Sequence, residues 1–170
     1  WSLLVLRAYD HLLLPPVLLA ISTAQAGIKK PPQLCRLAEC MLMIQLEAPQ
    51  GLNIQLPPEL RMRSEYAWQQ TYTAVQQAEA APSQLVEISA ALDGLGLPHR
   101  VRVFNTYPIE VLISHEATNG SATFAILLHP PSHYTSLRNL LGSLQLKARL
   151  LQALGCVVLH IRHDEWNEQR

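Results

Sequence analysis

The chain has 170 residues, of which 49% are hydrophobic and 15% are charged, and its formal net charge is zero with histidine neutral. This length suits one domain or a small domain with an appendage, and the neutral chain lacks the overall basic character of a nucleic-acid-binding domain. Average globular chains carry about 25% charged residues, so the low share here predicts an apolar surface that meets a partner or belongs to a larger assembly.

The sequence predicts neither a membrane segment nor a cysteine framework. No apolar run reaches the roughly 18 residues that a membrane-spanning helix needs. Three cysteines, Cys35, Cys40 and Cys156, form no disulfide pattern, and the first two lack further ligands for a metal ion. The chain begins with Trp1 instead of Met, which predicts a fragment or a processed chain.

The first 80 residues are predicted to form a helical segment. Leucines recur near helical spacing between residues 3 and 26, with an interruption at the pair Pro15-Pro16. Further helices are expected from the pair Pro31-Pro32 and from the stretch Leu56-Pro57-Pro58-Glu59-Leu60 to about Ala80, because proline suits the first turn of a helix. The prolines that open these helices are unevenly spaced, so they lack the fixed period of a repeat array.

Residues 81–170 are predicted to form a small α/β domain. Ser83 is the expected N-cap of its first helix, and arginines are expected to point outward from the first strand, which alternates polar and apolar residues. The predicted elements are a helix over 84–95, strands over 100–104 and 109–113, a hairpin turn over 117–120 and a strand over 123–128.

A strand–helix–strand crossover follows. The apolar run 124–128 stops at His129-Pro130-Pro131, and a second apolar run, 156–161, comes directly after Gly155. Neither run alternates with polar residues, as expected for parallel strands that are covered on both faces. The fold class is therefore α+β: an N-terminal α-helical segment, then a small α/β domain with a mixed sheet.

On the helix between these strands, one face is expected to pack on the sheet. Leu144, Leu151 and Leu154, or the residues next to them, are assigned to that face, which leaves Lys147 partly exposed.

Three sequence words in this region carry a family resemblance: AILLHPPSHY, LLGSLQLKARLLQALG and CVVLHIRHDEW, all after residue 124. They resemble the RAP domain, a C-terminal module of organellar RNA-handling proteins. Its pattern is an apolar strand ending in Gly-Pro-Ser-His-aromatic, then Leu-Gly, Leu-Lys-x-Arg-x-Leu, a Leu-Gly helix end, a Val-rich strand and Glu-Trp. The resemblance runs from near Leu97 to the end of the chain.

The resemblance implies a restriction-endonuclease-like fold and an RNA-binding protein of an organelle, most specifically a mitochondrion. The implied partners are RNA, more specifically rRNA, and the other proteins of a ribonucleoprotein. No membrane is expected as a partner. A structural subunit of a mitochondrial ribosome is the leading expectation. A trans-acting factor in organellar RNA processing or stability and a metal-dependent RNA endonuclease are the alternatives. The first 80 residues are then either a plain helical appendage or degenerate repeats resembling the octotricopeptide or pentatricopeptide class.

The acidic residues of a restriction-endonuclease-like site are missing. The family pattern has Glu and Asp two residues apart on the strand before Pro-Ser-His, and the corresponding residues here are Leu127 and His129. Glu110 on the preceding strand is the one remaining candidate acid, and a single carboxylate does not assemble a Mg²⁺ site. The chain is therefore expected to be no enzyme and to hold no metal ion or other cofactor.

Six of the seven histidines lie in the last 72 residues. His129 and His133 flank the end of the first crossover strand, and His160 and His163 lie at the end of the second, so all four are predicted to cluster where open sheets bind ligands. A metal site or a histidine general base is one interpretation. The simpler interpretation, in which His133 is the family's histidine and the others are strand-end or loop residues, is preferred.

The predicted RNA contacts are basic and aromatic residues, because basic side chains meet phosphates and aromatic rings stack on unpaired bases. Trp166 is expected to pack as a lid on the core instead. The predicted contact residues are Arg100, Arg102, His133, Tyr134, Arg138, Lys147, Arg149 and Arg162.

Overall fold

A computed structural model of the chain describes residues 7–8, 14–23, 28–48, 56–78, 82–105, 107–117, 120–135 and 139–168. The chain divides into two compact units, residues 1–75 and 76–170. None of the helices in the described ranges is long and apolar enough to cross a lipid bilayer.

The first unit is helical, as predicted. Prolines stand at the start of α3 and α4. Proline has no backbone N–H, but the N–H groups in the first turn of a helix have no partner within the helix, so proline costs no hydrogen bond there. The sequence therefore located both starts correctly. Buried leucines and one alanine form its core. The elements are α2 (Leu14–Thr23), α3 (Pro31–Glu47) and α4 (Pro58–Ala78), and the core residues are Leu34, Leu37, Leu56, Leu60 and Ala67.

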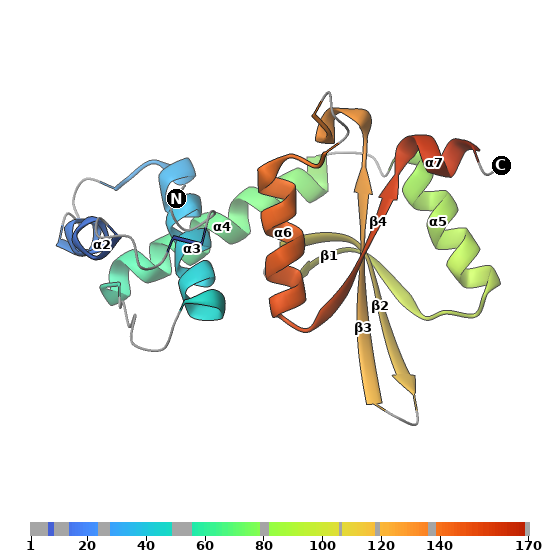
Figure 1. Cartoon of the computed structure of the whole chain (residues 1–170), viewed down its shortest axis with the longest axis horizontal. Helices are drawn as coiled ribbons and strands as arrows, with labels where there is room; N and C mark the ends of the chain where they lie inside the picture. Colours follow the sequence, from blue (N-terminus) through green and yellow to red (C-terminus); the bar gives the residue numbers. More distant parts are fainter. Residues whose placement is uncertain are drawn as a thin grey trace. The chain divides into compact units, whose positions relative to one another are not determined.

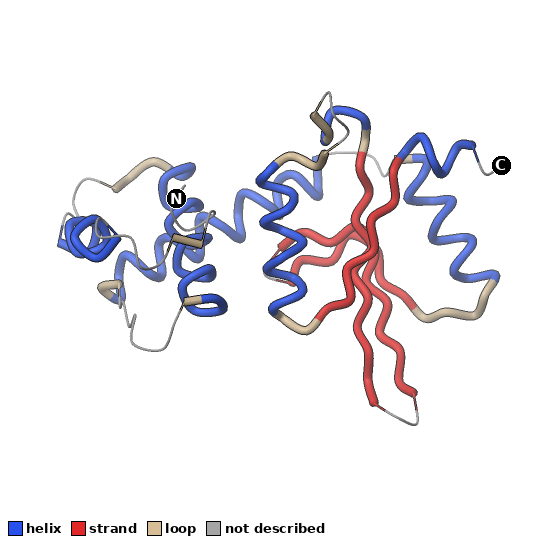
Figure 2. Tube along the Cα trace, viewed as in Figure 1, coloured by secondary structure: helices blue, strands red, loops and turns tan. Residues whose placement is uncertain are grey.

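The second unit is built on a four-stranded mixed sheet with the order β1-β2-β3-β4 (Figures 1 and 2). The first three strands form an antiparallel meander, and β4 returns parallel to β3 through the crossover helix, which confirms the predicted topology. The elements are α5 (Ser83–Gly94), β1 (His99–Asn105), β2 (Tyr107–Ala117), β3 (Gly120–His129), η1 (Pro131–His133), α6 (Gly142–Ala153), β4 (Cys156–Arg162) and α7 (His163–Glu168).

Helices cover both faces of this sheet (Figure 1). On one face, α5 packs its buried Leu85, Ile88 and Leu92 on alternate residues of β2 and β3, such as Val111 and Ile126. The opposite face carries α6, on which Leu146, Leu150 and Leu151 are buried. Cover on both faces explains why β3 lacks polar alternation, since residues 125–129 are all buried. The same expectation is wrong for β4, the last strand of the sheet, on which only Cys156 is buried.

The C-terminal helix α7 lies beside α5 (Figure 1). Trp166 packs against the α5 side of the core, and its indole N–H donates a hydrogen bond of 2.9 Å to Glu87 Oε2. The prediction that Trp166 closes the core is confirmed.

The structure corrects two local predictions. Pro82, not Ser83, is the N-cap of α5, and no side chain caps that helix. Leu154 does not face the sheet: α6 ends at Ala153, and Leu154 is 39% exposed at its C-cap, whereas Leu150 is fully buried. The helix ends here because Gly155 adopts a φ of +87°, which favours glycine.

Candidate nucleic-acid interface

The carboxyl ends of β3 and β4 meet at one edge of the sheet. The two strands are parallel, and their register pairs His129 with Arg162 and Leu127 with His160. Because side chains alternate along a strand, His129 and His160 lie on the same face, which is the face that α6 covers. Open sheets bind their ligands at this edge.

The turn after β3 carries His133 and Tyr134. Pro130 and Pro131 lack the N–H groups that a continuing strand needs, so β3 stops and a single 3-10 turn forms. Leu141 N–H donates to His133 O at 3.0 Å, and an isolated bridge pairs Tyr134 with Leu140. These contacts join the turn to the residues that lead into α6.

Three histidines form a continuous hydrogen-bonded chain at this edge. His129 Nε2 lies 2.7 Å from His160 Nδ1, and His129 Nδ1 lies 3.3 Å from His133 Nδ1. The His129 ring stacks on His160 and meets His133 edge to face. His129 is 2% exposed, whereas His133 is half-buried and His160 is exposed. We call this set, His133–His129–His160, the histidine chain.

The surroundings keep the histidine chain uncharged at neutral pH. Burial, together with the smaller effects of His160, His133 and Lys147, lowers the pKa of His129 to about 4. Burial also lowers the pKa of His133, with Glu110 opposing and Lys147 adding to the shift. The pKa of His160 is lowered by burial and by Lys147. Each ring therefore carries a single N–H at neutral pH.

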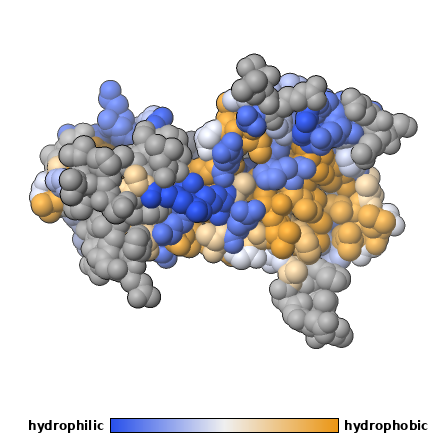
Figure 3. All heavy atoms as spheres, in the orientation of Figure 1, coloured by the Kyte–Doolittle hydropathy of each residue, from blue (hydrophilic) through white to orange (hydrophobic). Residues whose placement is uncertain are grey.

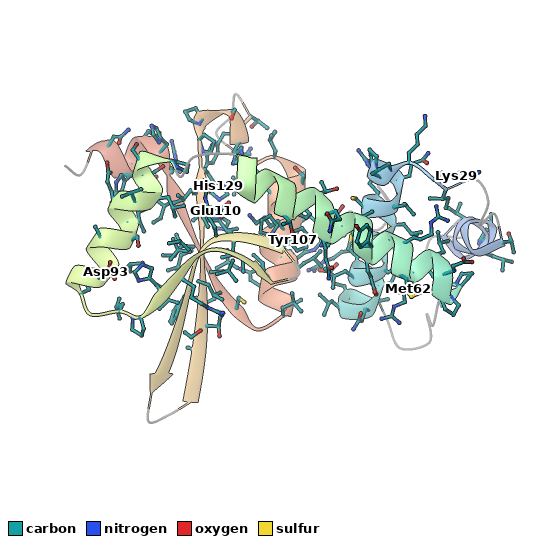
Figure 4. All side chains as sticks on the ribbon, turned by 180° about the vertical axis from the view of Figure 1, so that it is seen from behind. Lys29, Met62, Asp93, Tyr107, Glu110 and His129 are labelled. Atoms are coloured by element: carbon teal, nitrogen blue, oxygen red, sulfur yellow. The ribbon has the colours of Figure 1, made fainter. Side chains whose placement is uncertain are left out.

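An ion pair lies beside the histidine chain. Lys147 Nζ on α6 is 3.4 Å from Glu110 Oε1 on β2, and Figure 4 shows Glu110 close to His129. The expected partial exposure of Lys147 is wrong, because this residue is only 9% exposed. A lysine in this position needs a partner, and Glu110 supplies it across the sheet–helix interface. The second oxygen of Glu110, Oε2, is buried and has no hydrogen-bond partner within the described structure.

Tyr134 and Arg162 form the outer part of the same edge. The Arg162 guanidinium lies 5.2 Å from the centre of the Tyr134 ring, within the range of a cation–π contact. Arg162 also donates from Nε to Asp164 Oδ1 at 3.0 Å and approaches Glu165 Oε1 at 3.6 Å. The pKa of Asp164 is lowered, chiefly by its hydrogen bond from Arg162. Arg162 is therefore already paired with acidic residues of α7.

The other predicted contact residues do not join this group. Arg100 and Arg102 lie on β1, at the opposite end of the sheet, which is three strand spacings or about 14 Å from β4. Arg100 is exposed, and Arg102 adopts an unusual φ of +51°. Arg149 is half-buried on α6. Arg138 lies outside the described residues, as do residues 118–119 of the predicted hairpin turn.

The predicted cluster of four histidines is confirmed for three of them. His163 turns instead toward α5, where its Nδ1 lies 3.1 Å from Gln84 Oε1. The Glu110–Lys147 pair was missed: the two residues are 37 positions apart, and no local pattern signals their contact. No group of three or more His, Cys, Asp or Glu residues among those described is arranged to hold a metal ion.

Helices followed by a sheet with one parallel crossover make this an α+β protein, with its polar cluster at the crossover edge. Residues 126–170 match the family model of the RAP domain, so the C-terminal part of this chain carries a RAP domain. The match begins inside β3 and contains the histidine chain, α6 and α7. No curated protein matches the chain. A RAP domain suggests that the protein binds RNA.

Proposed function

We propose that this chain is a non-catalytic RNA-binding subunit of a mitochondrial ribosome, docked on ribosomal RNA. The observation that carries the proposal is the RAP domain at residues 126–170, which points to RNA as the partner. Domains that resemble this one are found in organellar proteins. The mitochondrial and ribosomal parts of the proposal go beyond that general setting.

The residues at the candidate acid positions support a non-catalytic role. Leu127 is an aliphatic residue in the core, and His129 is committed to hydrogen bonds with two other histidines. Glu110 is bound to Lys147, which neutralises its charge. Hard divalent cations such as Mg²⁺ prefer several carboxylate oxygens, and this edge offers one carboxylate that is already paired.

The surface supports a place in an assembly. His133 and Tyr134 are accessible beside the crossover edge, where an aromatic ring and neutral imidazoles suit unpaired bases and ribose. Val157 and Leu159 are also exposed apolar side chains on β4, the last strand of the sheet. Figure 3 shows a broad hydrophobic area on the second unit. Exposed apolar side chains on an edge strand favour a protein neighbour.

Co-sedimentation of the tagged chain from a mitochondrial lysate, with and without RNase, tests the proposal. We expect the protein to migrate with one ribosomal subunit and to resist washing with high salt. Migration as a free protein or in a small complex would instead identify a trans-acting RNA-processing factor. A complex that RNase leaves unchanged would contradict RNA binding itself.

The non-catalytic part has a separate test. The purified chain is incubated with a mixed single-stranded RNA in Mg²⁺ and in EDTA, alongside its Glu110→Gln variant. We expect the RNA to remain intact in every reaction. Mg²⁺-dependent cleavage that Glu110→Gln abolishes would show that the chain is an endonuclease.

A further inference from the structure

Three exposed cations gather at one corner of the first unit, where the chain enters α3. Lys29 and Lys30 come directly before the helix, and both are exposed. Arg63 of α4 reaches the same place across 35 positions of sequence, because its Nη2 donates a hydrogen bond of 2.8 Å to Ile28 O. Ile28 packs on the core of this unit, which fixes the segment in place. We call this set, Lys29, Lys30 and Arg63, the cationic corner.

Nearby acids do not neutralise the cationic corner. Within the described ranges, none of its three side chains forms an ion pair with a carboxylate. Arg63 lies four positions after Glu59, the spacing of a helical ion pair, yet it donates to the carbonyl of Ile28 instead. Glu65 is already paired with Arg61 at 2.8 Å. The corner therefore keeps an excess of positive charge, although the whole chain is neutral.

Folding alone does not account for this placement. The start of a helix favours acidic side chains and disfavours cations. Glu59 follows this rule in the first turn of α4, whereas α3 has no acid in its first turn and follows two lysines. Backbone N–H groups do not form the site either, because Pro31 and Pro32 have none and Gln33 N–H is bonded to Lys30 O. Side chains that break a local rule of stability suit a ligand that brings the opposite charge.

An exposed aromatic side chain lies one helical turn from the cationic corner. Tyr66 follows Arg63 by three positions on α4, and this spacing places two side chains on the same face of a helix. Tyr66 is 64% exposed. Its neighbours at helical spacing are Met62 before it and Gln69 and Gln70 after it, and all three are exposed. The face therefore combines a free aromatic ring with amide groups beside the cations.

We infer that the cationic corner and Tyr66 form a second RNA-binding surface, outside the RAP domain, which holds single-stranded RNA. Lys29, Lys30 and Arg63 meet neighbouring phosphates of one strand, and the Tyr66 ring stacks on an unpaired base beside them. A single strand presents both groups at once, because its bases are free to turn outward. The inference rests on the proposed RNA binding and adds a site that the family match at residues 126–170 does not include.

The aromatic ring favours RNA over other polyanions. An acidic peptide or a layer of anionic lipid headgroups also attracts lysine and arginine. Neither of these supplies a flat base for the exposed ring of Tyr66, whereas single-stranded RNA supplies bases and phosphates together. The RAP domain of the same chain also points to RNA.

The salt dependence of binding tests the phosphate contacts. The affinity of the full chain for fluorescent oligo(U) is measured from about 50 to about 200 mM salt, with wild type and the triple variant Lys29→Gln, Lys30→Gln, Arg63→Gln. We expect the slope of log affinity against log salt to become shallower by about 2, since each phosphate contact on a single strand contributes about 0.7. Affinity at the lowest salt should fall by about tenfold or more. The three side chains are exposed, so circular dichroism should show an unchanged fold.

Arg61→Gln is the matched control, since Arg61 is also an exposed arginine of α4 but is paired with Glu65. It should change the affinity by less than about twofold. A loss as large as that of Arg63→Gln alone would show that only total charge matters and would overturn the assigned surface.

Tyr66→Ala tests the stacked base separately. It should weaken binding about fivefold or more at every salt concentration and leave the slope unchanged, because stacking releases no counterions. An unchanged affinity would overturn the contact between Tyr66 and a base.

Failure of this inference differs from failure of the proposed function. RNA binding that the triple variant retains in full would overturn the second surface alone, whereas a chain that binds no oligo(U) would overturn both proposals. Vesicles of phosphatidylcholine and phosphatidylserine give the last comparison. If the triple variant lost binding to these vesicles but kept its affinity for oligo(U), the cationic corner would be a membrane contact and the inference would be wrong.

Discussion

Lys147 Nζ lies 3.4 Å from Glu110 Oε1, which joins the crossover helix to the second strand of the sheet across 37 positions of sequence. Both groups are largely screened from solvent at the contact, with side chains 11% and 32% exposed. Lys147 also contributes to lowering the pKa values of all three residues of the histidine chain, so one contact links packing to the chemistry of the edge.

Replacing Lys147 with methionine tests the contribution of the pair to stability. Methionine fills a similar volume but leaves Glu110 without its cation, so we expect the free energy of unfolding to fall by about 2 to 4 kcal/mol. Urea denaturation measures the change. The double variant Lys147→Met with Glu110→Leu should recover part of the loss, because it removes the unpaired charge. Additive losses in this cycle would show that the two residues are not coupled.

The buried histidine makes stability depend on pH. The pKa of His129 is about 4 in the folded chain and about 6.5 when unfolded. The unfolded state therefore binds more protons between these values, and stability falls as the pH drops from about 6.5 to about 4. The difference between the two pKa values of His129 corresponds to a loss of about 3 kcal/mol in the free energy of unfolding. The lowered pKa values of His133 and His160 make stability fall in the same direction.

Urea denaturation at pH 7.5 and pH 4.5 checks this expectation. The stability of wild type should fall, and the fall should be smaller in His129→Leu, which removes the most strongly shifted group. If the variant lost as much stability as wild type over the same interval, His129 would not be the titrating group.

A leucine pair on α6 tests the corrected orientation of that helix. Leu150 is fully buried, whereas Leu154 is 39% exposed at the helix end. We expect Leu150→Ala to lower the free energy of unfolding by about 2 to 5 kcal/mol through a cavity, and Leu154→Ala to change it by less than about 1 kcal/mol. Thermal or chemical denaturation measures both. Equal effects would mean that the helix faces the sheet differently.

Gly155 tests the end of the same helix. Its φ of +87° is unfavourable for any residue with a Cβ atom, although no heavy atom lies near the Cβ position. We expect Gly155→Ala to destabilise the chain by about 1 to 2 kcal/mol from backbone strain alone. Gly142→Ala is the control, because the space there is also open and φ is not positive. If Gly155→Ala left the free energy of unfolding unchanged, the turn would adopt another conformation in solution.

Local signals were sufficient to predict most of the elements. The Pro-Pro pairs placed the starts of α3 and α4, and Gly155 placed the end of α6, since these residues restrict or permit particular backbone angles wherever they occur. The two apolar runs of the crossover predicted parallel strands, and the structure confirms their pairing. The order of family words after residue 124 predicted the RAP domain.

Only part of the candidate site could be predicted from the sequence. The ends of parallel strands always meet at one edge, so His129, His133 and His160 were expected together and are found in contact. His163 was expected with them, but it is the first residue of α7 and faces α5. The direction of a side chain just past a strand depends on the next helix, which the strand pattern does not specify.

By itself the sequence determined the α+β class, the crossover and the RAP domain, because each depends on backbone preferences and periodicity within a short window. Only the tertiary structure decided that Lys147 is buried against Glu110 and that the basic residues of β1 lie across the sheet from Arg162. Contacts between distant segments depend on how a helix is rotated on a sheet and on strand order. Both are set by the packing of the whole core, not by any local pattern.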